Sequence, residues 1–461
     1  ITKKPSAMTI LSIVWMDGMN NWPEEAKQYI QSLEEKIESL TKELEKVKNA
    51  FADYKKRHPP NTGVKHGKPY HFKSSTISKK KKKPGAKKGH APHYRAMPKD
   101  IDETHYVPVI HCPQCGRRIC GNVQELRERV YEDIPVCHPV AVKVLIERRY
   151  CRHCHKLIEA PVSEVLPNAR IGLRTMLAVV WFKIHLRMTE EAIPQVFETL
   201  FGLHLSEGEV VCILRQIARV FGPYYQELIQ EIRKAEARNI DETSWRINGV
   251  NGYLWAFISK GIALFKIAQS RSHSVPLNVL GKQHHGVDIH DRFSAYKTLA
   301  GKTGNVQQDC WMHILKNAEE LASFSKKEGE HIHHVLQDVY HKAKAFDHQG
   351  TDEDIKSLFA WMKKTLDHPY KSHKCNRFVC NLLAEKDNLF EFVKNPFVDG
   401  TNNAAERALR PAVIARKIMG GNRSEKGSHD YEILMSVIQT LRKNGKNLIE
   451  HGSEILVTSH G

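Results

Sequence analysis

The sequence predicts a multidomain α+β protein, and three observations support this fold class. Apolar residues between positions 30 and 54 recur at alternating spacings of three and four, which indicates a coiled-coil helix. Two Cys-x-x-Cys pairs follow, as in small zinc-binding modules. Beyond residue 236, short strand-like runs precede helical stretches, which favours a mixed sheet with helices. A chain of 461 residues is long enough for about three domains.

Changes in composition and periodicity divide the chain into segments. The interval between the strand-like runs and the last helical block is longer than a compact sheet domain needs, so we expect a split core. The expected segments are an N-terminal tail (1–22), a coiled coil (23–57), a basic disordered linker (58–100), a zinc-binding domain (101–165), a helical DNA-binding or linker domain (166–235), an α/β core (236–313 and 396–430), a helical insertion (314–395), and a C-terminal helix and tail (431–461).

The coiled-coil segment has a narrow apolar seam flanked by Glu and Lys. Such a seam would cover little of the protein's own core, so we favour self-association as a dimer over a single amphipathic helix. The seam residues are Ile30, Leu33, Ile37, Leu40, Leu44, Val47, Phe51 and Tyr54.

The linker over 58–100 concentrates positive charge. The chain has a net charge of +18, and this segment is lysine-rich, aperiodic and contains Pro59-Pro60. We therefore expect a disordered tract that binds DNA phosphates without reading sequence, although a solvated tail is the alternative for its Pro-Gly part. The lysines expected to contact DNA are Lys79, Lys80, Lys81, Lys82, Lys83, Lys87 and Lys88.

The two Cys-x-x-Cys pairs predict one structural Zn²⁺ site. Each pair places two thiolates on one side of an ion, and two pairs complete a tetrahedron with Zn–S bonds of about 2.3 Å. Strand-like runs at 127–135 and 140–150 lie between the pairs, and the alternative is a set of reduced core thiols. The predicted ligands are Cys112, Cys115, Cys151 and Cys154.

Helical periodicity covers 170–235, before the α/β core begins. The core then opens with four strand candidates, at 239–245, 253–259, 264–269 and 287–291. The interval 314–395 is again helical and rich in histidine. A second metal site there is conceivable, but the irregular spacing favours scattered surface histidines. They are His313, which immediately precedes the interval, and His331, His333, His334, His341, His348, His368 and His373.

Three acids of the core could form one metal site. Asp241 and Asp291 each end a strand-like run, and carboxylates at strand ends converge in open α/β sheets. Glu406 begins a helical stretch and could approach the same point from the side. Such a site could hold two Mg²⁺ ions about 3.5–4 Å apart, with Mn²⁺ as an alternative, and cut nucleic acid.

Each acid also has a simpler interpretation. Aspartates often terminate strands, and Glu406 sits three residues after Asn403, as a capping-box glutamate would. Asp288 lies close to Asp291 and competes with it for the same role. Strand alternation directs Glu242 to the sheet face opposite that of Asp241, so we expect it to be structural.

Several sequence blocks together resemble the DDE transposases of the insertion sequence 66 family, over roughly residues 101–450. The resemblance implies a ribonuclease-H-like core with a catalytic triad of Asp241, Asp291 and Glu406. It departs from the family at Arg292, where glycine is common. The blocks are the cysteine pairs, Asp241-Glu242-Thr243, Asp291-Arg-Phe-Ser-Ala-Tyr296, Cys310-Trp311-Met-His313 and the stretch from Asn402 to Gly427.

The resemblance implies a prokaryotic mobile-element transposase. It would bind terminal inverted repeats and catalyse metal-dependent DNA cleavage and strand transfer without a covalent protein–DNA intermediate. Expected partners are double-stranded DNA of the element ends and target, a second copy of the chain, and in some cases accessory proteins of the same element. Two rivals are a catalytically idle DNA-binding regulator derived from a transposase and a ribonuclease-H-like nuclease without strand transfer.

Basic residues follow Glu406 along the same segment. Arg416 and Lys417 are expected to contact phosphate. Arg410 is a further candidate, with an ion pair to Glu406 at i+4 as its alternative.

Location is predicted from cysteine use and hydropathy. Ten cysteines spread over 461 residues do not resemble a secreted disulfide scaffold, so a reducing cytoplasm is expected. The apolar run at 9–16 is short for a signal peptide, lacks a cleavage site and cannot span a bilayer. We expect a cytoplasmic, nucleoid-associated protein with no membrane partner.

Overall fold

A computed structural model describes residues 31–32, 35–43, 45–46, 48–49, 96–160, 162–167 and 169–458. The chain forms two compact units, Ile1–Val130 and Tyr131–Gly461. The lysines predicted to bind DNA at 79–88 lie outside the described residues, as do most positions of the predicted coiled-coil seam.

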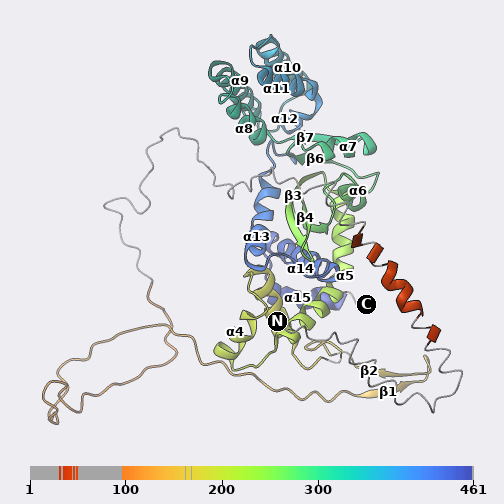
Figure 1. The fold of residues 1–461 in the computed structure, drawn as a ribbon. Coiled ribbons are helices and arrows are strands. Elements are labelled where there is room, and N and C mark those ends of the chain that lie inside the picture. The colour runs from red at the N-terminus through yellow and green to blue at the C-terminus, as the bar shows by residue number, and fades with distance from the viewer. Residues whose placement is uncertain are drawn as a thin grey trace, which may run out of the picture. The chain divides into compact units, whose positions relative to one another are not determined.

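The described residues between 31 and 49 are helical, as predicted (Figure 1). The Thr41 hydroxyl donates to the Ile37 carbonyl at 2.7 Å, one helical turn earlier. Two seam residues in this stretch, Ile37 and Leu40, are exposed. The pairing of two such helices stays a prediction.

The structure corrects the strands predicted at 127–135 and 140–150. Residues 122–147 have no regular secondary structure, and the first strand, β1 (Arg148–Cys151), pairs with β2 (Lys156–Glu159) in an antiparallel hairpin. Alternating apolar side chains at Ile134, Val136 and Val140 are 83–85% exposed. Alternation builds a strand only where a neighbouring strand and a core are available, and this segment has neither among the described residues.

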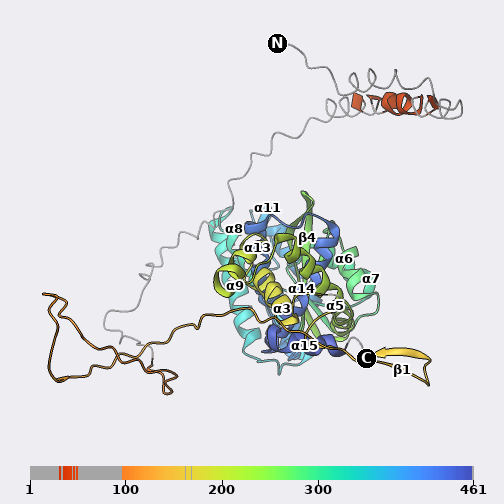
Figure 2. The ribbon, with the colours of Figure 1, turned by 90° about the horizontal axis from the view of Figure 1, so that it is seen from below.

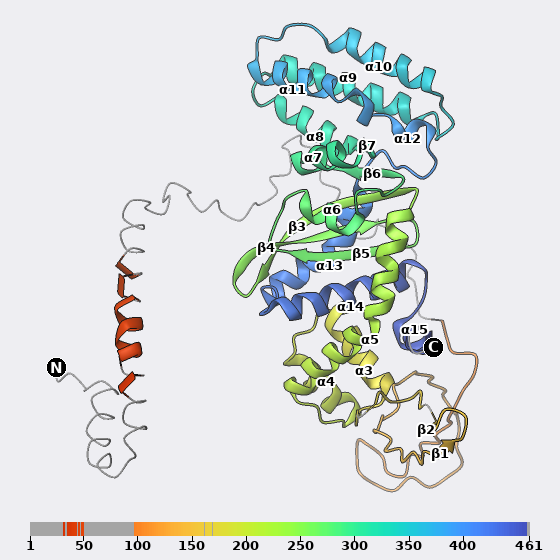
Figure 3. The same ribbon diagram turned by 90° about the vertical axis from the view of Figure 1, so that its right-hand side faces the viewer.

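Five strands form a mixed sheet in the second unit (Figure 3). Their spatial order is β5-β4-β3-β6-β7, in which β5, β4 and β3 are antiparallel neighbours and β3, β6 and β7 are parallel. The four predicted strands are confirmed with small shifts of their ends, and β7 was not predicted. The strands are β3 (Ala237–Ile247), β4 (Val250–Ile258), β5 (Ala263–Ala268), β6 (Val287–His290) and β7 (Val306–Asp309).

The hairpin between β3 and β4 has a clear local cause. Its two-residue loop, Asn248-Gly249, has positive φ at both positions, 50° and 76°. Asn and Gly tolerate this conformation, and the resulting turn matches the twist of the flanking strands. The turn residues therefore determine the register of the long β3 and β4 pair, which contains Asp241.

Helices surround the sheet, and the predicted helical regions are confirmed. Between the cysteine region and the sheet lie α3 (Leu173–Val180), a π-helical turn (Trp181–His185), α4 (Ala192–Phe201) and α5 (Glu207–Lys234). Within and after the sheet lie α6 (Ser274–Leu280), α7 (Ser294–Thr303), α8 (Trp311–Leu321), α9 (Lys326–Lys344), α10 (Asp352–Leu366), α11 (His373–Ala384), a 3₁₀ turn (Lys386–Asn388), α12 (Glu391–Lys394), α13 (Asn403–Met419), α14 (Glu425–Lys443) and α15 (Leu448–Thr458).

Two hydrophobic cores organise this unit. One contains β3 to β5 together with α3, α5, α13 and α14, so the helices predicted at 166–235 share a core with the sheet. Figure 2, which views the chain from below, shows α3, α5, α14 and α15 close together. The other core joins α8 to α12 with Val287 and Ile289 of β6. The insertion therefore rests directly on the strand that leads to Asp291.

Helix α14 covers the outer edge of β5 with polar side chains. The main-chain N–H groups of Ile267, Phe265 and Ala263 donate to Glu432 (2.7 Å), Ser436 (2.9 Å) and Thr440 (3.1 Å). Four helical residues advance about 6 Å and two strand residues about 6.8 Å, so the two spacings match. The helix thus supplies the hydrogen-bond acceptors that another strand would have provided.

No described helix is both long and apolar enough to cross a membrane.

Candidate catalytic site

The parallel pairing of β3 with β6 brings Asp241 and Asp291 together. Ala237 lies opposite Val287 and Asn239 opposite Ile289. The same offset puts Asp241 level with Asp291, immediately after the end of β6. The structure therefore places two acids at one level on adjacent chain segments.

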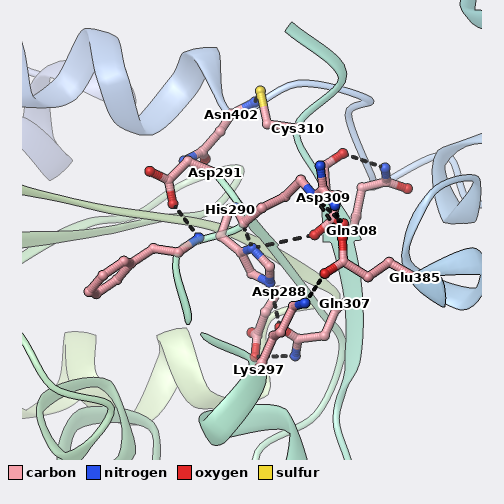
Figure 4. A network of polar contacts seen from close by, with 12 residues as sticks. Asp288, His290, Asp291, Lys297, Gln307, Gln308, Asp309, Cys310, Glu385 and Asn402 are labelled. Atoms are coloured by element: carbon pink, nitrogen blue, oxygen red, sulfur yellow. Dashed lines mark hydrogen bonds and ion pairs between the residues drawn. The ribbon is translucent and has the colours of Figure 1, made fainter. Parts of the chain in front are cut away.

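Helix α13 brings the third acid to the same place. Buried Asn402 precedes the helix, and its amide nitrogen donates to the Ile240 carbonyl at 2.8 Å. Its main-chain N–H donates to Cys310 Sγ at 3.1 Å, and these two residues lie side by side in Figure 4. The beginning of α13 is thereby fixed beside Asp241, and Glu406 lies in its first turn.

The three carboxylates affect one another electrostatically. Burial raises the pKa of Asp241 to about 8, and the charges of Glu242, Asp291 and Glu406 contribute in the same direction. The N–H of Glu242 donates to Asp241 at 2.9 Å and opposes this rise. Clustered carboxylates that raise a pKa in this way fit a divalent cation, because carboxylate oxygens are the ligands that Mg²⁺ prefers.

The simpler interpretations of Glu406 are wrong in this structure. Asn402, not Asn403, is the residue before the helix, and no side-chain capping hydrogen bond forms there. Among the described residues, the basic side chain within 4 Å of the Glu406 carboxylate is His313, whose Nδ1 lies 3.8 Å from Oε1, and Glu406 forms no ion pair with Arg410. Glu406 is thus neither a capping-box residue nor the partner of Arg410.

The two competing acids are neutralised by other protein groups. Glu242 accepts hydrogen bonds from Arg271 Nε at 2.7 Å and from the Tyr296 hydroxyl at 2.6 Å. Asp288 lies 2.9 Å from His284 Nε2 and 3.5 Å from Arg238 Nε, with all three side chains buried. Both acids therefore have structural partners, unlike Asp241.

Arg292 holds the turn after Asp291, a role that the sequence pattern did not predict. Its φ is +71°, a left-handed conformation that glycine adopts readily. Its guanidinium pairs with Glu385 and lies 3.3 Å from Asp309. Glu385 also pairs with Lys297 (Figure 4). The arginine at position 292, where glycine is common, was the signal in the sequence that could have indicated this network, because a left-handed arginine has to be held by contacts of its side chain.

Asp309 is part of this same network at the end of β7. Burial raises its pKa to about 7, and the charge of Arg292 opposes that rise. Glu385 comes from the end of α11, so the network connects the helical insertion to the turn that carries Asp291. Within that turn, the N–H of Phe293 donates to Asp291 Oδ1 at 3.0 Å.

Of the basic residues after Glu406, Arg416 is engaged within the protein. Its Nη1 donates to the carbonyl and the hydroxyl of Ser244 and lies 3.4 Å from the Thr243 hydroxyl. Arg416 and Lys417 line a shallow pocket beside β3. Arg416 therefore helps attach α13 to the sheet, and phosphate contacts by Arg410, Arg416 and Lys417 stay predictions.

The two cysteine pairs have the same local geometry in their separate units. N–H groups of Cys115 and Gln114 lower the pKa of Cys112. N–H groups of Cys154 and His153 lower the pKa of Cys151 in the same way. Such donors favour the thiolate form that binds zinc, so each pair fits the role predicted for it. A joint four-cysteine site stays a prediction.

Comparison with known proteins finds a family match that includes the three acids. The model of a family described as "Transposase IS66 family" matches residues 170–430. An uncharacterized protein, y4hP, from Sinorhizobium fredii (strain NBRC 101917 / NGR234) is 21% identical over 399 residues, which cover 77% of this chain and 71% of that protein. The family match spans β3 to β7 and α13, and hence all three acids.

Proposed function

Since the chain belongs to the IS66 family of transposases, we propose that it cleaves DNA at the ends of a mobile element and transfers the strands to a target. Asp241, Asp291 and Glu406 would hold two Mg²⁺ ions, or Mn²⁺ in their place. The observation that carries this proposal is the placement of the three carboxylates: Asp291 is level with Asp241, and Glu406 lies in the first turn of the helix that Asn402 anchors beside Asp241. Bound there, the ions would supply Lewis acidity at the attacking and leaving oxygens.

The protein's own contribution is to fix the acids in position. Main-chain N–H groups of Glu242 and Phe293 orient Asp241 and Asp291, and the Asn402 anchor sets the start of α13. Glu406 is partly exposed, so DNA can approach it. Because the nucleophile would be water or a DNA 3′-hydroxyl, no serine or tyrosine needs to form a covalent intermediate.

DNA binding would use parts of the chain outside the sheet. We propose that the lysine-rich linker supplies salt-dependent affinity for DNA. We also propose that the cysteine module binds zinc, that the core is ribonuclease-H-like, and that the N-terminal helix pairs two copies into a dimer. The net charge of +18 supports a polyanionic partner.

The test is a joining assay with DNA that carries the inverted repeats flanking the coding region. Wild-type protein with Mg²⁺ should release the element ends and produce joined products with target DNA. Cleavage without joined products would favour a nuclease, and sequence-specific binding without cleavage would favour a DNA-binding regulator.

A further inference from the structure

A second group of metal-binding side chains lies next to the proposed catalytic acids. One ligand atom from each of Cys310, His313 and Glu406 lies within 4.8 Å of the other two. Cys310 directly precedes α8 and is fully buried, His313 is in the first turn of that helix, and Glu406 faces them from α13. Thiolate, imidazole and carboxylate are all ligands of zinc-class ions.

The main chain around Cys310 repeats the geometry of the two cysteine pairs. In all three places, the N–H groups two and three residues after the first cysteine lower the pKa of its thiol, although burial raises the pKa of Cys310 overall. Cys310 also receives the N–H of Asn402 at 3.1 Å. The segment from Cys310 to His313 is therefore a Cys-x-x-His counterpart of a zinc-binding Cys-x-x-Cys turn.

The histidine of this group has a buried nitrogen without a hydrogen-bond partner. His313 Nδ1 lies 3.8 Å from Glu406 Oε1, which is too long for a hydrogen bond. Two ligands at 2.0–2.1 Å from one tetrahedral ion are about 3.3 Å apart, so a small movement would bring both to a shared ion. The unpaired nitrogen and the carboxylate are thus arranged for a cation between them.

We propose that Cys310, His313 and Glu406 bind one thiophilic divalent cation of the zinc class, at a site that shares Glu406 with the proposed catalytic centre. A sulfur and a nitrogen ligand select zinc or cobalt over Mg²⁺, which prefers oxygen. Three protein ligands leave a fourth position open.

The shared carboxylate gives the site a regulatory consequence, which rests on the proposed function. An ion held by Cys310 and His313 would draw Glu406 away from Asp241 and Asp291. Micromolar Zn²⁺ should therefore oppose Mg²⁺-dependent cleavage.

Metal binding itself is tested on the full-length, metal-free chain by titration with Co²⁺, whose thiolate charge-transfer absorption reports cysteine ligation. Wild type should bind one more equivalent than Cys310→Ser. Cys375→Ser is the matched control, because Cys375 is also fully buried but lies in the insertion, and it should bind as wild type does. Equal stoichiometry and spectra for wild type and Cys310→Ser would overturn the site.

A second variant tests the same site in case Cys310→Ser does not fold. His313 is partly exposed, so His313→Gln should fold, as thermal melting can verify. It should weaken cobalt binding by at least the roughly 10- to 100-fold that loss of a supporting group around a metal ligand costs. Wild-type affinity in folded His313→Gln would refute the proposal.

Asp241→Asn separates this proposal from the proposed function. It should keep the cobalt absorption although it loses cleavage. A wild-type chain that binds cobalt but does not cut DNA would disprove only the transposase mechanism.

Discussion

Asp241 and Glu242 are neighbours on β3, and burial raises the pKa of both, yet only Glu242 has side-chain partners that oppose the rise. On one face of the sheet, Glu242 receives Arg271 and Tyr296. At the end of the parallel strands, Asp241 receives one main-chain N–H and the repulsion of further acids. Glu242 thus has its partners within the protein, whereas the acids around Asp241 fit the divalent cation that we propose.

The largest expected effect is on DNA cleavage by variants of the three acids that we propose to bind Mg²⁺. Asp241→Asn, Asp291→Asn and Glu406→Gln should each lower cleavage by roughly 10²- to 10³-fold or more, because a neutral amide holds a divalent cation poorly. Binding to the element ends should persist. Rates measured with labelled DNA, beside Glu242→Gln as control, would check this, and full strand transfer by Glu406→Gln in Mg²⁺ would exclude its role.

Replacing an acid that has charged partners in the protein should instead lower the stability of the fold. Asp288→Ala leaves the fully buried guanidinium of Arg238 without its counter-charge, so we expect a loss of about 3–5 kcal/mol in the free energy of unfolding. Asp241→Asn, which removes repulsion, should not destabilise the metal-free protein. Urea unfolding compares the two, and a similar loss in both would remove the distinction between the two groups of acids.

The raised pKa of Asp241 should make metal-free stability depend on pH. The folded chain keeps this proton up to about pH 8, whereas the unfolded chain releases it near pH 4. The folded state binds more protons in this window, so the free energy of unfolding falls as pH rises, by at most about 1.4 kcal/mol per unit.

Urea unfolding with a chelator at several pH values, for wild type and Asp241→Asn, isolates this contribution. The difference between the two should grow toward pH 8, and Mg²⁺ should reduce it by binding the folded wild type. A difference that stays constant over the window would contradict the assigned pKa.

The smallest effect concerns the turn after Asp291. Replacing Arg292 removes its ion pairs in either variant, but Arg292→Gly relieves the left-handed backbone and Arg292→Ala does not. We expect the glycine variant to be more stable than the alanine variant by about 1 kcal/mol. Thermal unfolding would show it, and an equal melting temperature would mean that the strain is absent.

The sequence predicted the parts of the sheet whose signal is local. The apolar runs made Asp241 and Asp291 candidates, and the resemblance to a transposase family selected them together with Glu406. Contrary to the prediction, Asp241 does not end its strand but lies within β3. Strand β7 was missed because two of its four residues are glutamines. Gln307 and Gln308 are buried only because His290 and Leu389, distant in sequence, supply their hydrogen-bond partners.

The failure at 127–150 has the reverse cause. In this segment apolar and polar residues alternate as in a strand, but the described structure provides no partner strand. The pattern alone therefore does not produce a sheet. The Arg292 network was also beyond local inference, because Glu385 reaches it from the insertion. Local sequence patterns predicted helices and strands. Which polar residues are buried depends on hydrogen-bond and ion-pair partners from segments distant in sequence.

The contact between α14 and β5 limits how copies of this protein can associate. An exposed strand edge invites pairing with a strand of another chain. Here the N–H groups of Ala263, Phe265 and Ile267 are already bound by the side chains of α14. Strand addition at this edge would have to displace α14, so two copies that met there would not exchange strands.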